Sequence, residues 1–138
     1  MTRPTVDETL MQVARVFAQR GTCSRMQVGC VIAKEGRILT SGYNGAPAGF
    51  DHCDHTRIPN APCSWTVHAE ANALVFAAKH GVRVWEATLY TTLSPCFTCA
   101  GMILNAGIAR VVYSTPYRCM DGVAWLESGG VPVEVCGL

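Results

Sequence analysis

The sequence predicts an α/β fold, a three-layer α/β/α sandwich around a central mixed five-stranded sheet. Short apolar segments typical of strands alternate with segments whose apolar residues recur at helical spacing. The turn at Lys34–Arg37 favours a hairpin between the first two strands, whereas the later strands alternate with helices, which favours a layered sheet. A chain of 138 residues has room for one core, so we expect residues 1–138 to form a single domain.

Each element is recognised by its pattern and by the residues that end it. The first helix, Thr5–Arg20, has apolar residues at helical spacing and is followed by Gly21, which is typical of a helix end. The other elements are expected, in order, as strands at Val28–Ala33 and Ile38–Ser41, a long loop at Gly42–Ser64, a helix at Val67–His80, a strand at Ala87–Thr92, a helix at Pro95–Asn105, a strand at Arg110–Ser114, a helix at Met120–Glu127 and a strand at Val131–Val135.

Two short motifs, His-Ala-Glu at 68–70 and Pro-Cys-Phe-Thr-Cys at 95–99, indicate a metal site. A catalytic zinc keeps three protein ligands and leaves a fourth position open for water. His68, Cys96 and Cys99 supply that number of ligands. Pro95 suits the first position of a helix, whose free N–H groups and dipole lower the pKa of nearby thiols. The cysteines are therefore expected to bind as thiolates.

Glu70 is expected to be the catalytic acid and base. It lies two residues beyond His68, so a helix does not place it on the same metal vertex. It is instead in reach of a zinc-bound water, whose proton it would pass to the ring nitrogen and the departing amine. Such a set is typical of zinc-dependent nucleobase deaminases.

Other interpretations of these motifs remain open. A lone Cys-x-x-Cys also occurs in redox pairs and in structural zinc sites, and the whole set would also fit a non-catalytic zinc-binding module. Glu70 argues against a purely structural site, because such a site has no use for a carboxylate that is not a ligand. The two motifs occur in order, each at the start of a predicted helix, which favours the catalytic interpretation.

Composition restricts the partners and the compartment. The net charge is +1, and the arginines do not cluster into a basic stripe, so no stable nucleic-acid partner is expected. The polar start Met1–Glu8 has no apolar signal segment, and no stretch reaches the length of a membrane span. We therefore expect a cytoplasmic protein without a membrane partner, in which the eight cysteines are reduced and serve as metal ligands or small core residues.

Several further segments match a known family in order and spacing. They are Val28–Ile32, Ser41–Pro47 with its Gly-Tyr-Asn-Gly sequence, His68–Ala73, Leu89-Tyr90, Pro95–Ala100, Ala106–Ile108 and Val111–Tyr113. From Thr22 to about Tyr117 the chain resembles the deoxycytidylate (dCMP) deaminases of the cytidine deaminase-like superfamily. The resemblance implies zinc-dependent hydrolysis of dCMP to dUMP and ammonia.

The resemblance also implies substrate contacts. Asn44 would bind the sugar, and the backbone of Ala69 would hold the base carbonyl. Ser94 would place its backbone near the leaving amine, and Tyr117 would border the substrate. Arg25 and Arg118 flank segments expected at the mouth of the site and are candidates to meet the phosphate.

A second zinc site is a further expectation. Some dCMP deaminases carry a structural zinc in this part of the chain, and Cys23 and the Cys53-Asp54 pair match that pattern. We expect the fold to bring Cys63 and either His52 or His55 beside them. Our candidate ligand set is Cys23, Cys53, Cys63 and His52. The alternative is that these cysteines are simply buried apolar side chains.

Related branches supply the alternative activities, namely deamination of cytosine, guanine, a nucleoside or a tRNA adenosine. A tRNA deaminase would need a basic surface, and the Gly-Tyr-Asn-Gly segment favours a nucleotide over a free base. The resemblance further implies a homo-oligomer, a hexamer or a tetramer.

Overall fold

The computed structural model describes residues 2–55, 63 and 65–137, which form five strands and four helices. In chain order these are α1 (Val6–Ala18), β1 (Gly29–Lys34), β2 (Arg37–Tyr43), α2 (Ala69–His80), β3 (Thr88–Leu93), α3 (Phe97–Ala106), β4 (Arg110–Thr115), α4 (Asp121–Ser128) and β5 (Val133–Val135). None of these described helices is long and apolar enough to cross a membrane.

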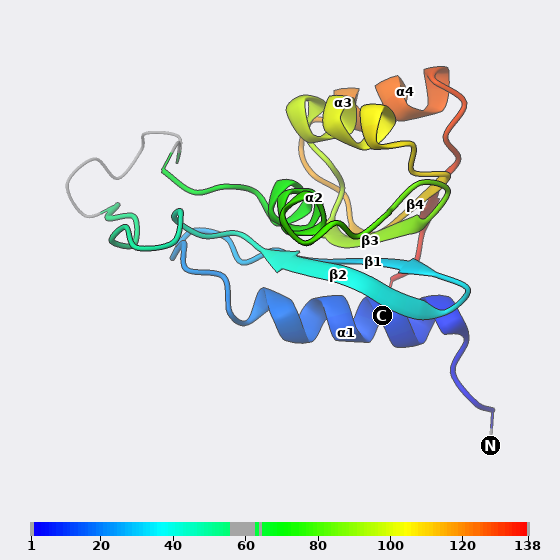
Figure 1. The fold of residues 1–138 in the computed structure, drawn as a ribbon, viewed down its shortest axis with the longest axis horizontal. Helices are drawn as coiled ribbons and strands as arrows, with labels where there is room; N and C mark the ends of the chain where they lie inside the picture. Colours follow the sequence, from blue (N-terminus) through cyan, green and yellow to red (C-terminus); the bar gives the residue numbers. More distant parts are fainter. Residues whose placement is uncertain (1, 56–62, 64, 138) are drawn as a thin grey trace.

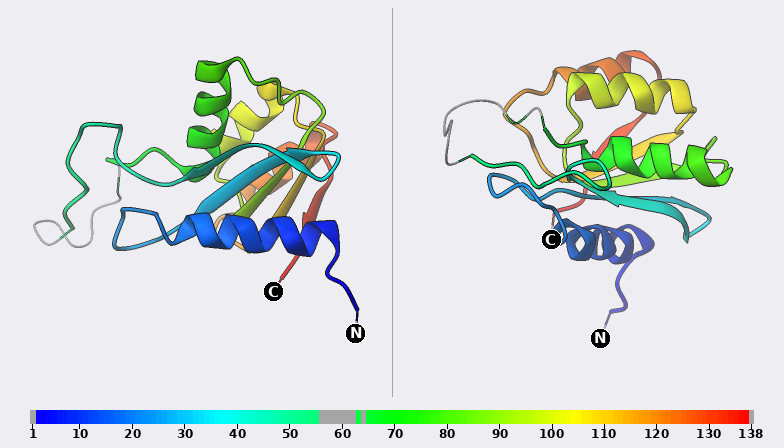
Figure 2. Two further views of the ribbon diagram at one scale, coloured as in Figure 1. Left: turned by 60° about the horizontal axis from the view of Figure 1, so that its bottom comes forward. Right: turned by 60° about the vertical axis from the view of Figure 1, so that its left-hand side comes forward.

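The five strands form one mixed sheet in the order β2-β1-β3-β4-β5. β1 pairs antiparallel with β2 and with β3, whereas β3, β4 and β5 run parallel. Helix α1 covers one face, and α2, α3 and α4 cover the other (Figure 1), as the two further views in Figure 2 also show. The predicted three-layer sandwich is thus confirmed.

The side chains of β1 explain the layering, because successive residues of a strand point to opposite faces. Val31 and Ala33 pack with Met11 and Ala14 of α1, whereas Ile32 packs with the residues that α2, α3 and α4 bury on the other face. Fully burying a side chain of this size contributes about 1.5–3 kcal/mol. Both layers are therefore held to the same buried strand.

The starts of two helices differ from the sequence-based expectation. α2 begins at Ala69 with His68 as its N-cap, and α3 begins at Phe97 with Cys96 as its N-cap. Pro95 therefore precedes the N-cap, and its predicted place at the first helical position is wrong. An N-cap residue has extended backbone angles, as both residues do here, so its side chain can turn away from the helix.

Two glycines let helices approach the sheet closely. A Cβ on Gly29 of β1 would overlap the carbonyl oxygen of Ala14 and lie 2.6 Å from the backbone nitrogen of Ala18. A Cβ on Gly42 of β2 would lie 2.7 Å from the backbone nitrogen of Ala73. Gly42 was expected to begin the long loop, but it lies inside β2, where only a residue without a side chain fits under α2.

Replacing Gly29 with alanine should therefore destabilise the fold. Because the clash is with helix backbone, α1 would have to move away from β1, at a cost of about 1–3 kcal/mol or more. Urea unfolding of Gly29→Ala should show a clearly lower midpoint than the parent protein. Gly137→Ala is the matched control, since a Cβ there meets nothing within 4 Å. Equal midpoints for the Gly29 variant and the parent would show that α1 is not held this closely.

Candidate zinc-dependent active site

Three candidate metal ligands converge where α2 and α3 begin. The Nδ1 atom of His68 lies 3.4 Å from the Sγ atom of Cys96 and 3.4 Å from that of Cys99. All three donor atoms lie within 4.8 Å of one another. Cys99 is buried, Cys96 is half-buried and His68 is exposed, so the group is closed on the core side and open on the other.

The chemistry and spacing of these donors fit zinc. Zinc–sulfur bonds of about 2.3 Å and zinc–nitrogen bonds of about 2.0 Å, at a tetrahedral angle, separate nitrogen and sulfur by roughly 3.5 Å. The observed separation of 3.4 Å agrees with that value. One nitrogen and two sulfurs leave a fourth position, as in a catalytic rather than a closed structural site.

The two thiols have opposite tendencies to ionise. Cys96 has its pKa lowered to about 4, because it accepts hydrogen bonds from Cys99, from His68 and from the backbone N–H of Cys99. The pKa of Cys99 is raised, because it donates to the Cys96 thiolate, is buried and lies near Glu70. The pair thus shares a single proton, which a zinc ion would displace. The 3.5 Å contact from the Cys99 N–H to the Cys96 sulfur is the N-terminal helix contribution that was expected.

Glu70 lies in the first turn of α2 and is 4 % exposed. Burial raises the pKa of its carboxyl to about 7, against the lowering effect of its own backbone N–H and of His68. A carboxyl with such a pKa can both take and return a proton at neutral pH. It lies outside the group of donor atoms that fits a metal, although it borders the same pocket.

A pocket of about 710 Å³ opens beside the three donors. His68, Glu70 and Cys96 line its floor. Its wall contains every residue that the sequence singled out for substrate contact, namely Arg25, Asn44, Ala69, Ser94, Tyr117 and Arg118. The fold therefore brings six positions from five separate segments around one cavity of suitable size for a small ligand.

The side chain of Asn44 lines this pocket and also makes two hydrogen bonds to the backbone of a neighbouring segment. Its side-chain oxygen accepts from the N–H of Val28 at 2.8 Å, and its Nδ2 donates to the carbonyl of Met26 at 2.7 Å. These two bonds hold the segment that follows Arg25 against β2. An amide has two donors and two lone pairs, so Asn44 keeps one of each for a ligand.

The loop that carries Asn44 is attached directly to the start of α2. Asn72 donates through Nδ2 to the carbonyl of Tyr43 at 2.8 Å. Gly45 and Val67 form an isolated antiparallel bridge with two backbone hydrogen bonds. Since Val67 directly precedes His68, the position of the loop and that of a metal ligand are linked.

A second group of metal-binding side chains lies beside the same pocket. The donor atoms of Cys23, Cys53, His55 and Cys63 all lie within 4.8 Å of one another, and the Cys23 sulfur is 3.2 Å from Nε2 of His55. Cys23 and Cys63 also line the pocket. Three sulfurs and one imidazole are a common closed zinc set.

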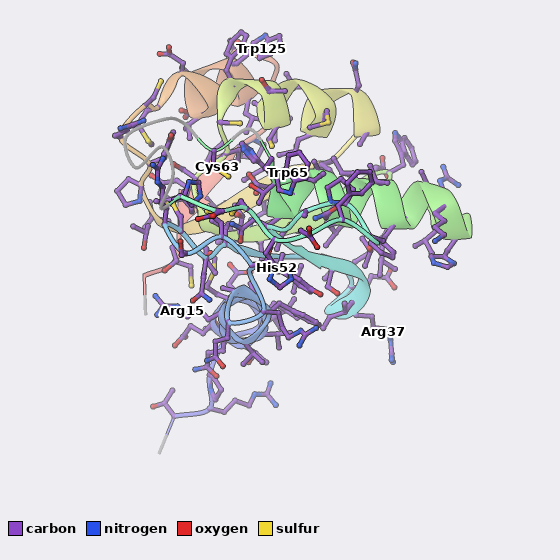
Figure 3. The ribbon with its side chains drawn as sticks, turned by 90° about the vertical axis from the view of Figure 1, so that its left-hand side faces the viewer. Arg15, Arg37, His52, Cys63, Trp65 and Trp125 are labelled. Atoms are coloured by element: carbon purple, nitrogen blue, oxygen red, sulfur yellow. The ribbon has the colours of Figure 1, made fainter. Side chains whose placement is uncertain are left out.

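His52 does not belong to this group, and His55 takes its place. His52 instead lines a separate pocket of about 730 Å³, next to the outer strand β2 and helix α2. In Figure 3 the labelled His52 and Cys63 lie well apart on this face of the molecule. The spacing of the two histidines around Cys53 does not indicate which of them joins the cysteines, because the segment has no regular secondary structure.

Some pocket residues were not anticipated. Met26, Val28, Thr66 and Leu93 also line the cavity. Val28 is the first residue of the predicted strand Val28–Ala33, and Leu93 directly follows the predicted strand Ala87–Thr92, so their positions at strand ends were a usable signal. Met26 and Thr66 lie in irregular segments, where no periodicity indicates which side chains turn inward.

Comparison with known proteins agrees with this geometry. Residues 4–115 match the family model described as the cytidine and deoxycytidylate deaminase zinc-binding region. The deoxycytidylate deaminase of Mycobacterium phage D29 is 40% identical over 126 residues, which cover 82% of this chain and 97% of that protein. The deoxycytidylate deaminase of Saccharomyces cerevisiae is 37% identical over 142 residues, 96% of this chain, although the match spans only 45% of the yeast protein.

A solved structure is similar over nearly the full length. The dCMP deaminase of the cyanophage S-TIM5, crystallised in complex with dCMP and dUMP, superposes with a TM-score of 0.90 at 38% identity, and the match covers 99% of this chain and 100% of that one. The arrangement of ligands, carboxyl group and pocket and the family match lead to the same assignment. The chain belongs to the cytidine and deoxycytidylate deaminase zinc-binding family.

Proposed function

We propose that this protein hydrolyses dCMP to dUMP and ammonia at a zinc held by His68, Cys96 and Cys99. The observation that carries the proposal is the buried Glu70 beside an open three-donor zinc set, in a pocket whose rim carries arginines. The similar phage and yeast proteins are deoxycytidylate deaminases, which supports this nucleotide as the substrate.

Zinc held by His68, Cys96 and Cys99 would supply a Lewis acid, which would lower the pKa of a coordinated water towards ~7. Glu70 faces the same pocket and takes the proton of the attacking water. It would deliver this proton to N3 of the pyrimidine. Once the water oxygen is bonded to C4, Glu70 would take the second proton of that oxygen and give it to the amine, which leaves as ammonia. Burial raises the pKa of the Glu70 carboxyl to about 7, which suits a group that both accepts and donates a proton at neutral pH.

The pocket wall accounts for binding and orientation. Ala69 is the first residue of α2, so its N–H lacks a partner within the helix and is available to the base carbonyl. The remaining capacity of the Asn44 amide serves the sugar. Arg25 and Arg118 provide guanidinium groups, which suit phosphate oxygens through charge-assisted hydrogen bonds.

We further propose a structural zinc at Cys23, Cys53, His55 and Cys63. This zinc would tie the segment before β1, which holds Cys23, to the long connection between β2 and α2, beside the pocket. We also propose that the protein is cytoplasmic and forms a homo-oligomer, either a hexamer or a tetramer. Exposed apolar side chains on the outer face of α2, Val75 and Phe76, support association with further copies.

The substrate proposal is tested by comparing turnover of dCMP, CMP, deoxycytidine, cytosine, guanine and a tRNA anticodon stem-loop with the zinc-loaded protein. We expect dCMP to be deaminated with the highest kcat/KM, because the rim arginines favour a monophosphate. Mass spectrometry of the products distinguishes all six reactions. A higher kcat/KM for a nucleoside, a free base or the RNA would refute the substrate while leaving the zinc chemistry intact.

Glu70→Gln keeps the shape of the side chain but removes the proton carrier. We expect kcat to fall by about 10²–10⁴-fold while the zinc content stays that of the parent. Glu127→Gln, on the exposed face of α4, is the matched control and should keep full activity. Ammonia release and elemental analysis give the two readouts. A Glu70 variant within about twofold of the parent would be incompatible with this mechanism.

The two zinc sites predict different metal stoichiometries. Cys99→Ala should lose the catalytic zinc, and His55→Ala should lose the structural zinc, because each variant lacks one of the protein ligands of that metal. His52→Ala should bind as much zinc as the parent, since His52 lies outside the group. Elemental analysis of the purified variants measures the zinc bound per chain. Full zinc content in His55→Ala, or a loss in His52→Ala, would show that the ligand set is wrong.

A further inference from the structure

The hydroxyl of Ser94 connects two segments that both border the pocket. Ser94 lies between β3 and α3, directly before Pro95 and Cys96, and is 2 % exposed. Its Oγ accepts a hydrogen bond from the N–H of Tyr117 at 2.6 Å, and it donates towards the sulfur of Met120 at 3.5 Å. Both the acceptor and the donor capacity of the hydroxyl are thus directed at the segment between β4 and α4.

Two hydrogen bonds with Ser94 hold the start of this segment, one at Thr115 and one at Tyr117. The N–H of Ser94 donates to the carbonyl of Thr115 at 2.9 Å, which anchors the end of β4. Pro116 has no N–H, so the amide of Tyr117 is the first donor after the strand. The Ser94 side chain takes that donor, and the hydrogen bond is short for one with an N–H donor.

From Tyr117 the connection continues to a charged group. The guanidinium of Arg118 lies 5.7 Å from the centre of the Tyr117 ring, a cation–π contact. Both side chains line the pocket. A shift of the Tyr117 backbone would therefore move the ring and the guanidinium together.

We propose that Ser94 is a positioning residue for phosphate recognition, because its side chain holds Tyr117 and, through it, Arg118 at the rim of the pocket. This role is separate from the backbone contact with the leaving amine, which the family resemblance implies for Ser94. It rests on the proposed function only in that the substrate is a nucleoside monophosphate. The hydroxyl makes the enzyme prefer the nucleotide over the nucleoside.

The test compares the parent with Ser94→Ala on two substrates, dCMP and deoxycytidine. Loss of one well-formed hydrogen bond that positions a charged group should lower kcat/KM for dCMP by about tenfold, mainly through a higher KM. The preference for dCMP over deoxycytidine should fall by a similar factor. Ser128→Ala is the matched control, because the Ser128 hydroxyl is also hydrogen-bonded to the backbone, as a donor to the carbonyl of Trp125, but does not line the pocket.

Hydrogen exchange provides a readout that does not depend on activity. In Ser94→Ala the amide of Tyr117 should exchange faster, while amides of α1 and the zinc content remain those of the parent. Equal losses on dCMP and deoxycytidine, or an unchanged exchange rate at Tyr117, would overturn the proposal. A purely structural role of Ser94 gives the first of these results.

A double-mutant cycle with Arg118 distinguishes an effect of Ser94 that acts through Arg118 from a general loss of substrate binding. If Ser94 acts through Arg118, Arg118→Gln alone lowers the dCMP preference, and adding Ser94→Ala lowers it little further. Additive losses would refute the proposal, and an unchanged preference in Arg118→Gln would refute it even where Ser94→Ala does not fold. A parent that itself prefers deoxycytidine would instead refute the substrate proposed above, so the two failures are distinguishable.

Discussion

The convergence of two helix N-termini on one point is the constraint on which the rest of the structure depends. His68 and Cys96 are the N-caps of α2 and α3, and Cys99 closes the first turn of α3. Side chains at such positions leave the helix in the direction of its free N–H groups, so the donors meet in a region that already favours negative charge. The stability of thiolates in this site therefore depends on the two helix N-termini as much as on the ligands themselves.

Holding these helix starts together requires close packing around them. α2 buries mainly alanines, and the strand below it has Gly42 where a side chain would meet the α2 backbone. On the other side, a Cβ on Gly122 at the start of α4 would lie 2.7 Å from the backbone of Cys96. The small residues at these contacts leave α2, α3 and α4 little freedom to shift, so the donor geometry is set before a metal binds.

The strand and helix order was predictable because each element has a clear period and a glycine or a turn at its end. The exact helix starts were not, because an N-cap and a first helical residue look alike in sequence: His68 and Pro95 were both expected inside helices. The choice between His52 and His55 depended on how an irregular segment turns, which carries no periodic signal. The residues of the pocket wall were predicted from the family resemblance. The hydrogen bonds by which Asn44 also holds the segment at Met26 and Val28 were not, because nothing in the sequence indicates these partners.

The bridge between Gly45 and Val67 has a consequence for how this architecture can diversify. The chain leaves the sheet region and returns to it at paired residues, so the stretch between them is an excursion whose two ends are fastened side by side. Lengthening such an excursion costs little, about 0.6 kcal/mol for each doubling, as long as its paired ends and the metal-binding residues within it keep their places. A change of length between the metal-binding residues of this stretch would leave His68 and Glu70 in place, because the pairing of Gly45 with Val67 fixes the point at which the chain enters α2.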